Sequence, residues 1–303
     1  MTGGTRLQLA APAKLNLYLH IAGRRDDGYH RVDSLIAFAE TGDVVTVTPA
    51  RDMTLAVDGP FAAALPLSDD NLVLRAAAQL RVRAGVASGA AITLTKNLPV
   101  ASGIGGGSAD AAATLRALAV LWRLDAETCG SAAIAAGLGA DVPVCLVGRT
   151  SLVTGIGDRI AASPRLPAIP VVLANPGVAL PTADVFRGYD AAQSQHGGMG
   201  VADDWRGIAD AATLATRLSA TANDLEAAAI ALAPAIADAL AALGALPGCL
   251  LARMSGSGAT CLALFADDAA ARAAAAALQA ACPRWWVVAT RLRSAPPDVV
   301  ELH

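Results

Sequence analysis

The sequence predicts an α+β protein of two domains, and three observations support this fold class. The chain has 303 residues, where a single domain typically has roughly 150. Hydrophobic residues make up 54% of the chain and charged residues only 16%, which supplies apolar material for a large packed core. The C-terminal part ends in a strand–helix–strand pattern, which is typical of a sandwich whose sheet is covered by helices.

The first half of the chain alternates extended and helical patterns. Apolar or alternating runs predict strands at Leu7–Ala10, Leu15–Ile21, Ser34–Ala39 and Val44–Thr48. A helix capped by Asp69 or Asp70 is predicted to end at Gly85. A strand at Ala91–Thr95 then leads through a glycine-rich loop into a helix at Ser108–Trp122.

The second half predicts strands and helices in a different order. Strands are expected at Pro170–Ala174, Leu250–Met254, Thr260–Phe265 and Trp286–Leu292, and helices at Asp204–Leu218, Ala233–Leu243 and Asp268–Ala281. The segment Ser163–Pro170 is the predicted domain boundary, which divides the chain into residues 1–165 and 166–303. Gln193–Gly200 is predicted to be a loop, and Tyr189 to Leu218 match no known functional pattern.

Charge and cysteine content argue against several classes of protein. The net charge of −3 provides no general attraction to nucleic acid or to an acidic membrane surface. The five cysteines are far apart and form neither a disulfide framework nor a CxxC metal motif. The N-terminus lacks the pattern of a signal peptide, and we find no long uninterrupted apolar run, so a cytoplasmic protein is expected.

The segment Pro99–Ala109 is the strongest local signal, because it contains four glycines in five positions from Gly103 to Gly107. Glycines let the backbone approach an anion, and the following helix adds free N–H groups and a positive dipole end, which suits a polyphosphate. A tight turn without a ligand is the alternative. The P-loop and dinucleotide patterns do not fit, because Ser108 and Ala109 follow Gly107 directly. A second loop of small residues, Ser255–Ala259, lies between two predicted strands.

Three segments resemble the signatures of the GHMP small-molecule kinases: Pro12–Asn16, Pro99–Ala109 and Met254–Ala259. Within that superfamily, four further segments are similar to kinases of a cytidine-linked substrate: Gly23–His30, Asp70–Leu72, Gly139–Pro143 and Pro181–Phe186. These segments follow the family order over nearly the whole chain. Two departures are mild: Ile104 stands where Leu is usual, and Ser257 stands where Thr is usual.

The resemblance implies a two-domain GHMP kinase fold. Its N-terminal domain would be a ribosomal-protein-S5-domain-2-like sandwich and its C-terminal domain a ferredoxin-like α/β sandwich, with the active site in the cleft between them. The implied cosubstrate is ATP with Mg²⁺. The expected ATP-binding residues are Asn71, Lys96, Pro99, Val100, Ala101, Ser102, Gly103, Ile104, Gly105, Gly106, Gly107, Ser108 and Ala109.

The family pattern assigns catalysis to Lys14 and Asp141. Lys14 lies between apolar residues in a predicted buried strand, and a buried ammonium needs an anionic partner such as a carboxylate or a phosphate. Asp141 precedes an apolar run, so the alternative for it is a helix N-cap. By resemblance, Asp141 is the catalytic carboxylate and Lys14 its cationic partner, which would orient a hydroxyl and stabilise developing negative charge.

The substrate implied by the resemblance is a cytidine diphosphate-linked methylerythritol, phosphorylated on its 2-hydroxyl in the non-mevalonate route to isoprenoid precursors. Its expected contacts are Asn16, Tyr29, His30, Thr182 and Phe186, and Ser108 is the expected protein contact of Mg²⁺. The alternatives are ordinary packing for the two aromatic residues, a core amide for Asn16 and an N-cap for Ser108. A homoserine or mevalonate kinase and a non-catalytic ATP-binding regulator remain as alternative functions, and a monomer or weak homodimer is expected.

Overall fold

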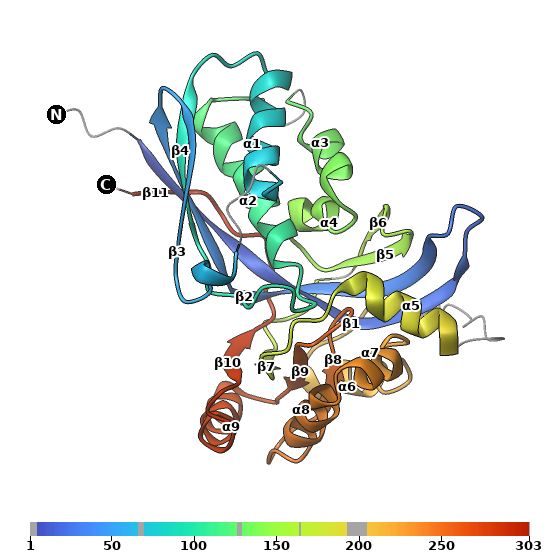
Figure 1. The fold of residues 1–303 in the computed structure, drawn as a ribbon. Coiled ribbons are helices and arrows are strands. Elements are labelled where there is room, and N and C mark those ends of the chain that lie inside the picture. The colour runs from blue at the N-terminus through green and yellow to red at the C-terminus, as the bar shows by residue number, and fades with distance from the viewer. Residues whose placement is uncertain (1–4, 66–69, 126–128, 164, 193–204, 303) are drawn as a thin grey trace.

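The computed structural model describes residues 5–302, with gaps at 66–69, 126–128, 164 and 193–204. It contains two β-sheets, and helices lie against both (Figure 1). The predicted α+β class is therefore confirmed. Among the described helices, none is long and apolar enough to cross a membrane.

The larger sheet is built on two long antiparallel strands, β1 (Arg6–Arg24) and β2 (His30–Ala50). The strand order is β11-β1-β2-β4-β3, and β5 and β6 extend the sheet from the beginning of β2. Its other strands are β3 (Met53–Asp58), β4 (Gly89–Thr95), β5 (Ser151–Gly155), β6 (Arg159–Ala162) and β11 (Val300–Leu302). The last described residues of the chain thus return to its first strand.

Four helices cover one face of the larger sheet, on the upper side in Figure 1. The central one, α2 (Gly106–Leu121), packs against β1 and β2 and buries mainly alanines, whose small side chains allow close approach. Around it lie α1 (Leu72–Arg83), α3 (Ser131–Leu138) and α4 (Val142–Val147), and a short 3₁₀ helix spans Ala62–Ala64.

The smaller sheet is antiparallel and has the strand order β10-β7-β9-β8. Its strands are β7 (Pro170–Asn175), β8 (Leu251–Met254), β9 (Cys261–Leu264) and β10 (Trp286–Arg291). Every residue of β7 and β9 is buried, which explains their continuous apolar sequences. The C-terminal helices are α5 (Thr182–Ala192), α6 (Ala211–Leu218), α7 (Glu226–Leu232), α8 (Ala235–Gly244) and α9 (Asp268–Ala281).

The sequence predicted two separate strands in each of β1 and β2, whereas the structure joins them. A register shift between Pro12 and Lys14 explains the break in the pattern, since proline has no N–H to donate and is tolerated in a sheet at such an irregularity. Lys14 and Asn16 therefore lie buried within one continuous strand, and the N–H of Asn16 donates to Ser255 Oγ in the C-terminal half.

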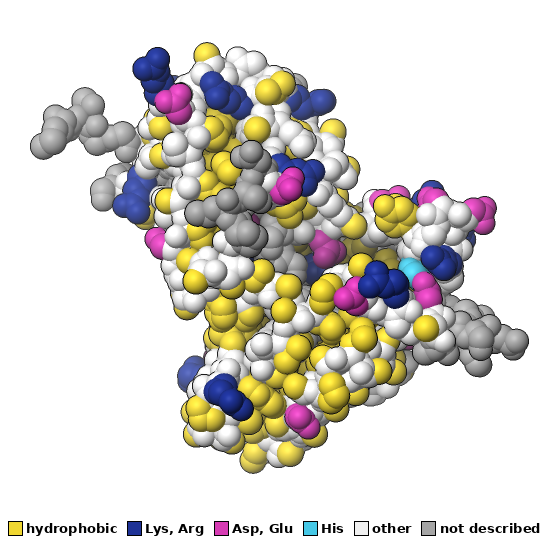
Figure 2. Space-filling model, in the orientation of Figure 1, with side chains coloured by type: hydrophobic (Ala, Val, Ile, Leu, Met, Phe, Trp, Pro, Cys, Tyr) yellow, Lys and Arg dark blue, Asp and Glu magenta, His cyan; other side chains and the backbone are white. Residues whose placement is uncertain are grey.

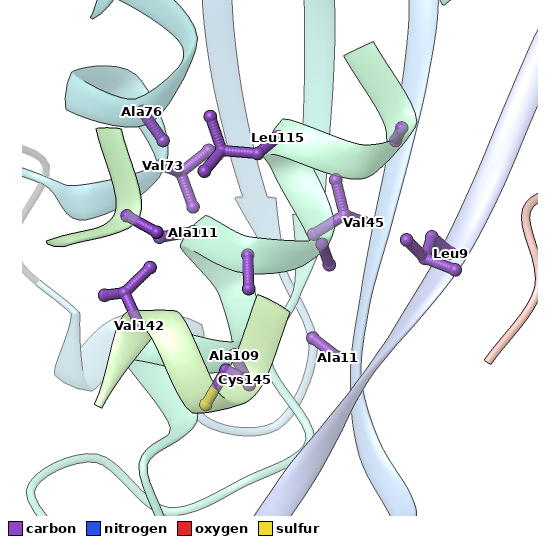
Figure 3. Close-up of a cluster of buried hydrophobic side chains, with 14 of the residues drawn as sticks. Leu9, Ala11, Val45, Val73, Ala76, Ala109, Ala111, Leu115, Val142 and Cys145 are labelled. Atoms are coloured by element: carbon purple, nitrogen blue, oxygen red, sulfur yellow. The ribbon is translucent and has the colours of Figure 1, made fainter. Parts of the chain in front are cut away.

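The hydrophobic core between the larger sheet and its helices is shown in part in Figure 3. Side chains from β1 (Leu9), β2 (Val45), α1 (Val73) and α2 (Leu115) are all buried and belong to one cluster (Figure 3). This packing fixes α2, and with it the glycine loop that precedes α2, on the sheet.

A second buried cluster joins the two sheets. Leu15 and Leu35 of the larger sheet pack in one cluster with Leu173 and Leu264 of the smaller sheet. Because these residues lie on both sides of position 165, the two halves of the chain share a core. The boundary between residues 165 and 166 stays a prediction.

Several local predictions need correction. Asn71, rather than Asp70, caps α1, because its Oδ1 accepts the N–H of Val73 at 2.9 Å. The strands β3, β5, β6 and β11 were not predicted, since they are short and several of their residues are exposed. The helices α3, α4, α5 and α7 were also missed. The helix predicted at Asp204–Leu218 begins only at Ala211, because residues 205–210 are not helical and Asp210 caps α6 by accepting the N–H of Thr213. Asp69, Asp204 itself and the Gln193–Gly200 loop lie outside the described residues.

Candidate active site

A cavity of about 880 Å³ opens where the larger sheet, the glycine loop and α5 meet. The surface is hollowed in this region, between the helices above and α5 below (Figure 2). Among the described residues on the face shown there, basic and acidic side chains are interspersed. Most of the predicted site residues line the cavity, including both predicted catalytic residues and the whole predicted substrate set.

The glycine loop enters α2 through Gly105, which has a left-handed backbone with φ of +61° and is the N-cap residue. The next three residues, Gly106, Gly107 and Ser108, form the first turn of α2, whose N–H groups have no partner within the helix. Since all three line the cavity, these N–H groups and the helix dipole favour an anion there. Ser108 is therefore not the N-cap.

The glycine loop packs backbone to backbone against the second small-residue loop. A Cβ at Gly103, whose φ is +75°, would lie 2.5 Å from the carbonyl oxygen of Gly258. Ser255 Oγ donates to the Gly103 carbonyl at 3.2 Å and accepts the N–H of Asn16 at 3.1 Å. The two loops and β1 are thus held together, and glycine is required at 103 by both conformation and space.

Lys14 and Asp141 form an ion pair at the cavity wall. Lys14 Nζ lies 2.9 Å from Asp141 Oδ2, and the side chains are 6% and 44% exposed. Asp141 occupies the N-cap position of α4 but its side chain caps no N–H there, so the alternative role as a cap is wrong. The side chain of Lys14 runs beneath Gly105, and a Cβ added at Gly105 would lie 3.1 Å from Lys14 Cβ. A buried ammonium is thereby paired with a carboxylate that remains accessible from the cavity.

Asn16 and Thr182 present polar groups nearby. Asn16 Nδ2 donates to Ser34 Oγ at 2.8 Å, while its buried Oδ1 has no partner among the described residues. A buried, unpaired oxygen beside a cavity is a candidate acceptor for a ligand hydroxyl. Thr182 Oγ1 lies 2.9 Å from Ser257 Oγ, which joins the start of α5 to the second loop.

His30 contacts two aromatic rings of α5. Phe186 stacks on it with ring centroids 4.8 Å apart, and Tyr189 meets it edge-on at 6.1 Å. Its Nε2 lies 2.6 Å from Asp190 Oδ1. Tyr29, by contrast, is 63% exposed. The structure therefore brings His30 and Phe186 into contact, and it leaves the ring of Tyr29 largely in solvent at the rim.

Lys96 sits beneath the glycine loop, with its ammonium bound by the side chains of two aspartates. Its Nζ lies 2.5 Å from Asp43 Oδ2 and 2.9 Å from Asp110 Oδ2, and all three side chains are buried. Asp43 Oδ1 also accepts the N–H groups of Asn97 and Leu98, at the entry to the loop. Burial raises the pKa of Asp110 to about 8, against the lowering effect of Lys96.

Three residues of the expected ATP set do not line the cavity. Asn71 caps α1 with its side chain, and Ile104 and Ala109 are buried in the core. Conversely, sequence reasoning missed Asp43, Asp110 and Asp190. Asp110 follows the glycine signature by one residue, but only its contact with Lys96 distinguishes it from a helix-surface acid.

The described residues contain no cluster of three or more acidic, histidine or cysteine side chains that could hold a metal ion by themselves. The donors near the glycine loop are Ser108 and the exposed carboxylate of Asp141. One carboxylate and a hydroxyl fit Mg²⁺ carried mainly by nucleotide phosphates, which is how this ion usually binds in kinases.

Comparison with known protein families identifies the class of protein. The family described as GHMP kinases N terminal domain matches residues 71–149, and GHMP kinases C terminal matches residues 201–284. With the fold and the glycine loop described above, this identifies an ATP-dependent small-molecule kinase of the GHMP type.

Relatives that align with nearly the whole chain identify the family within this class. A 4-diphosphocytidyl-2-C-methyl-D-erythritol kinase of Cereibacter sphaeroides is 55% identical over 284 residues, covering 93% of this chain and 98% of that protein. A kinase of the same name from Parvibaculum lavamentivorans is 52% identical over 278 residues, covering 92% and 95%. The chain belongs to the 4-diphosphocytidyl-2-C-methyl-D-erythritol kinase family.

Solved structures agree with this placement. The crystal structure of a 4-(cytidine 5'-diphospho)-2C-methyl-D-erythritol kinase superposes with a TM-score of 0.77 at 33% identity, covering 94% of this chain and 98% of that one. A homoserine kinase from Cytophaga hutchinsonii gives a TM-score of 0.74 at 18% identity, covering 99% and 98%. The second match shows the fold alone, and together they confirm the predicted GHMP kinase fold.

Proposed function

We propose that this protein transfers the γ-phosphoryl group of ATP to the 2-hydroxyl of 4-diphosphocytidyl-2-C-methyl-D-erythritol, giving the 2-phosphate and ADP. The observation that carries this proposal is the Lys14–Asp141 ion pair, which lines the same cavity as the N-terminus of α2. Family membership over 93% of the chain supports the choice of substrate. The reaction is a step of the non-mevalonate route to isoprenoid precursors, and the protein is proposed to act in the cytoplasm.

Phosphoryl transfer requires a positioned hydroxyl, compensation of phosphate charge and in-line geometry. The accessible carboxylate of Asp141 accepts a hydrogen bond from the acceptor hydroxyl and takes its proton as the oxygen bonds to phosphorus. The bond between the γ-phosphorus and the bridging oxygen breaks, and ADP leaves. Lys14 keeps the Asp141 carboxylate in place and stabilises the negative charge that develops on the transferring group.

The glycine loop binds the phosphates of ATP in this proposal. The first-turn N–H groups of α2, from Gly106 to Ser108, are donors for phosphate oxygens. Mg²⁺ would be held by the phosphates with Ser108 and Asp141 nearby, and it would neutralise part of the phosphate charge. The ammonium of Lys96 is bound by Asp43 and Asp110, and Lys96 also lines the cavity, so its contact with ATP stays a prediction.

The cytidine end of the substrate is placed by His30, Phe186 and Tyr29. The Phe186 ring stacks on the imidazole of His30, with the two ring centroids 4.8 Å apart. A base that forms a hydrogen bond with the edge of His30 therefore lies beside the Phe186 ring. Asn16, with its unpaired Oδ1, is proposed to bind a hydroxyl of the methylerythritol. These contacts separate the proposed substrate from homoserine and mevalonate, which carry no base.

The test is ADP release by the purified protein with ATP, Mg²⁺ and the cytidine-linked substrate. Methylerythritol phosphate without the cytidine group, homoserine and mevalonate serve as matched acceptors. We expect ADP release above background only with the cytidine-linked acceptor. Equal or faster release with homoserine or mevalonate would identify a different GHMP kinase, and no release with any acceptor would indicate a non-catalytic nucleotide-binding protein.

A further inference from the structure

Asp190 of α5 makes a contact that no sequence pattern indicated. Its Oδ1 lies 2.6 Å from His30 Nε2, and its Oδ2 lies 3.5 Å from Nη1 of Arg24. The side chains of His30 and Asp190 are 11% and 32% exposed, and all three residues line the cavity. One carboxylate thus joins the end of the β1–β2 hairpin to α5.

This contact fixes which ring nitrogen of His30 carries the hydrogen. A neutral imidazole has one N–H, and the nitrogen facing a carboxylate oxygen at hydrogen-bond distance is the donor. Nε2 therefore carries the hydrogen and Nδ1 carries a lone pair. Among the described residues, none forms a hydrogen bond with Nδ1. Nδ1 is also not fully buried, since the fully buried polar atoms without a partner do not include it. It is therefore accessible from the cavity that His30 lines.

The ring can change neither its tilt nor its tautomer without losing contacts. Phe186 packs on one face of His30 at 4.8 Å and Tyr189 meets it edge-on at 6.1 Å, so the ring is held in place. Reversing the tautomer would put the lone pair of Nε2 against the oxygen of Asp190, which is repulsive. His30 therefore presents a hydrogen-bond acceptor of fixed direction.

An acceptor at this position distinguishes the two common pyrimidines. Cytosine carries an amino group at C4, which donates a hydrogen bond, whereas uracil carries a carbonyl oxygen there, which only accepts. The lone pair of Nδ1 is satisfied by the amino group. Opposite the carbonyl oxygen of uracil, the lone pair of Nδ1 has no hydrogen to accept and is repelled. A site that hydrogen-bonds one polar group strongly rejects an analogue that lacks this group.

Resting on the function proposed above, we propose that Asp190 is a positioning residue that sets the preference for cytosine over uracil by holding His30 as an acceptor at Nδ1. Asp190 acts through His30 and makes no contact with the reacting atoms. Its replacement should therefore change base preference more than turnover.

The experiment compares kcat and KM for the cytidine-linked substrate and its uridine-linked analogue. In Asp190→Asn, the amide can donate or accept and so no longer selects one tautomer of His30. We expect the cytidine-to-uridine ratio of kcat/KM to fall by about tenfold, mainly through KM, with the KM for ATP unchanged. Asp190→Glu keeps the carboxylate and should recover part of the ratio. Asp184→Asn, an exposed acid on the same helix, is the matched control.

A second measurement does not depend on turnover. ¹⁵N-edited NMR of the unliganded protein, with His30 assigned by comparison with His30→Gln, should show the Nε2–H form in the wild type. Asp190→Asn should show a mixture of the two forms. An unchanged base preference, or an unchanged tautomer, in a folded Asp190→Asn variant would overturn the proposal. A wild-type protein that fails to phosphorylate the cytidine-linked substrate would instead reject the proposed function, and with it this role of Asp190.

Discussion

At the scale of single residues, the pair of Lys14 and Asp141 combines two different environments. The ammonium is buried and the carboxylate is almost half exposed, so the pair is neither a buried salt bridge nor a surface one. The exposed carboxylate can exchange its bond to Lys14 for one to a substrate hydroxyl. The buried ammonium keeps a fixed position, because the side chain of Lys14 packs under Gly105.

Replacing Asp141 with Asn should lower turnover steeply while ATP and the acceptor still bind. The amide keeps the shape of the side chain but can no longer take a proton, and one positioned acid–base group contributes about 10²–10⁴-fold to a rate. Steady-state ADP release and substrate titration measure the two effects separately. Asp52→Asn, at an exposed position outside the cavity, is the control. Turnover within about threefold of the wild type would show that Asp141 has no role in proton transfer.

Phe186→Ala tests the nucleobase site. Stacking on an aromatic ring is worth about 1–3 kcal/mol per base, so the KM for the cytidine-linked substrate should rise by roughly 5- to 150-fold. The KM for ATP should hardly move, since Phe186 lies on α5 and packs against His30 rather than against the glycine loop. A weaker KM for ATP with an unchanged KM for the cytidine-linked substrate would mean that the two nucleotides have been assigned to the wrong ends of the cavity.

At the scale of elements, the site depends on the contact between the glycine loop and the Ser255–Ala259 loop. Both loops approach through backbone atoms, and β1 contributes the N–H of Asn16 to the same contact. The polyphosphate site and the acceptor site are therefore parts of one assembly of three segments.

Gly103→Ala should disturb this assembly. The new Cβ would lie 2.5 Å from a backbone oxygen at a φ of +75°, so the free energy of unfolding should fall by about 1–3 kcal/mol and the KM for ATP should rise. Urea unfolding and ATP titration measure these effects. Gly137→Ala in α3, where no atom lies within 4 Å, should be neutral or stabilising by up to about 1 kcal/mol. Equal stability of the two variants would show that the loops can separate at little cost.

The buried group of Asp43, Lys96 and Asp110 predicts a dependence of stability on pH. The pKa of Asp110 is raised from 3.8 to about 8, chiefly by burial. Between these values the unfolded chain releases the proton and the folded protein keeps it, so the stability that Asp110 contributes declines as pH rises and levels off above about 8. Lys96, whose pKa is raised above 10.5, stays charged throughout this range.

Asp110→Asn removes this titration. The free energy of unfolding of the wild type, minus that of Asp110→Asn, should decrease steadily from about pH 4 to about pH 8 in urea unfolding experiments. Asp52→Asn, at an exposed site, should show no such trend relative to the wild type. A difference that stays constant or grows with pH would mean that Asp110 is ionised in the folded protein over this range.

At the scale of the whole molecule, the two sheets are joined by a common core and by the return of the chain end. Leu15 and Leu35 pack with Leu173 and Leu264, and β11 pairs with β1. The cavity lies where these parts meet, so its walls depend on both halves of the chain.

A fragment of residues 166–303 should consequently fail to fold alone. It would expose the face of the smaller sheet that is covered by β1 and β2 in the intact protein. We expect no cooperative transition in urea for this fragment and a single transition for the full chain, followed by circular dichroism. Coexpression with residues 1–165 is the control, since it should restore a soluble complex. A cooperative transition in the isolated fragment would establish 166–303 as an independent domain.

The sequence by itself determined the class of this protein and many of the segments at its site. The glycine loop, the small-residue loop and the segments around Lys14 and Asp141 are local patterns, and a local pattern is readable wherever the chemistry depends on neighbours in the chain. The helix that follows the glycine loop and the strands of the smaller sheet were also predicted, because periodicity and continuous apolar runs are local too.

Only the tertiary structure decided which side chains meet. Lys14 and Asp141 are 127 positions apart, and His30 and Asp190 are 160 apart. Such contacts depend on strand register, on the register shift after Pro12 and on the packing of α5 over the hairpin, none of which a local pattern encodes. For the same reason the sequence did not show that Lys96, expected by resemblance to contact ATP, lies between two buried acids. Its partners come from β2 and α2, and folding alone brings them together.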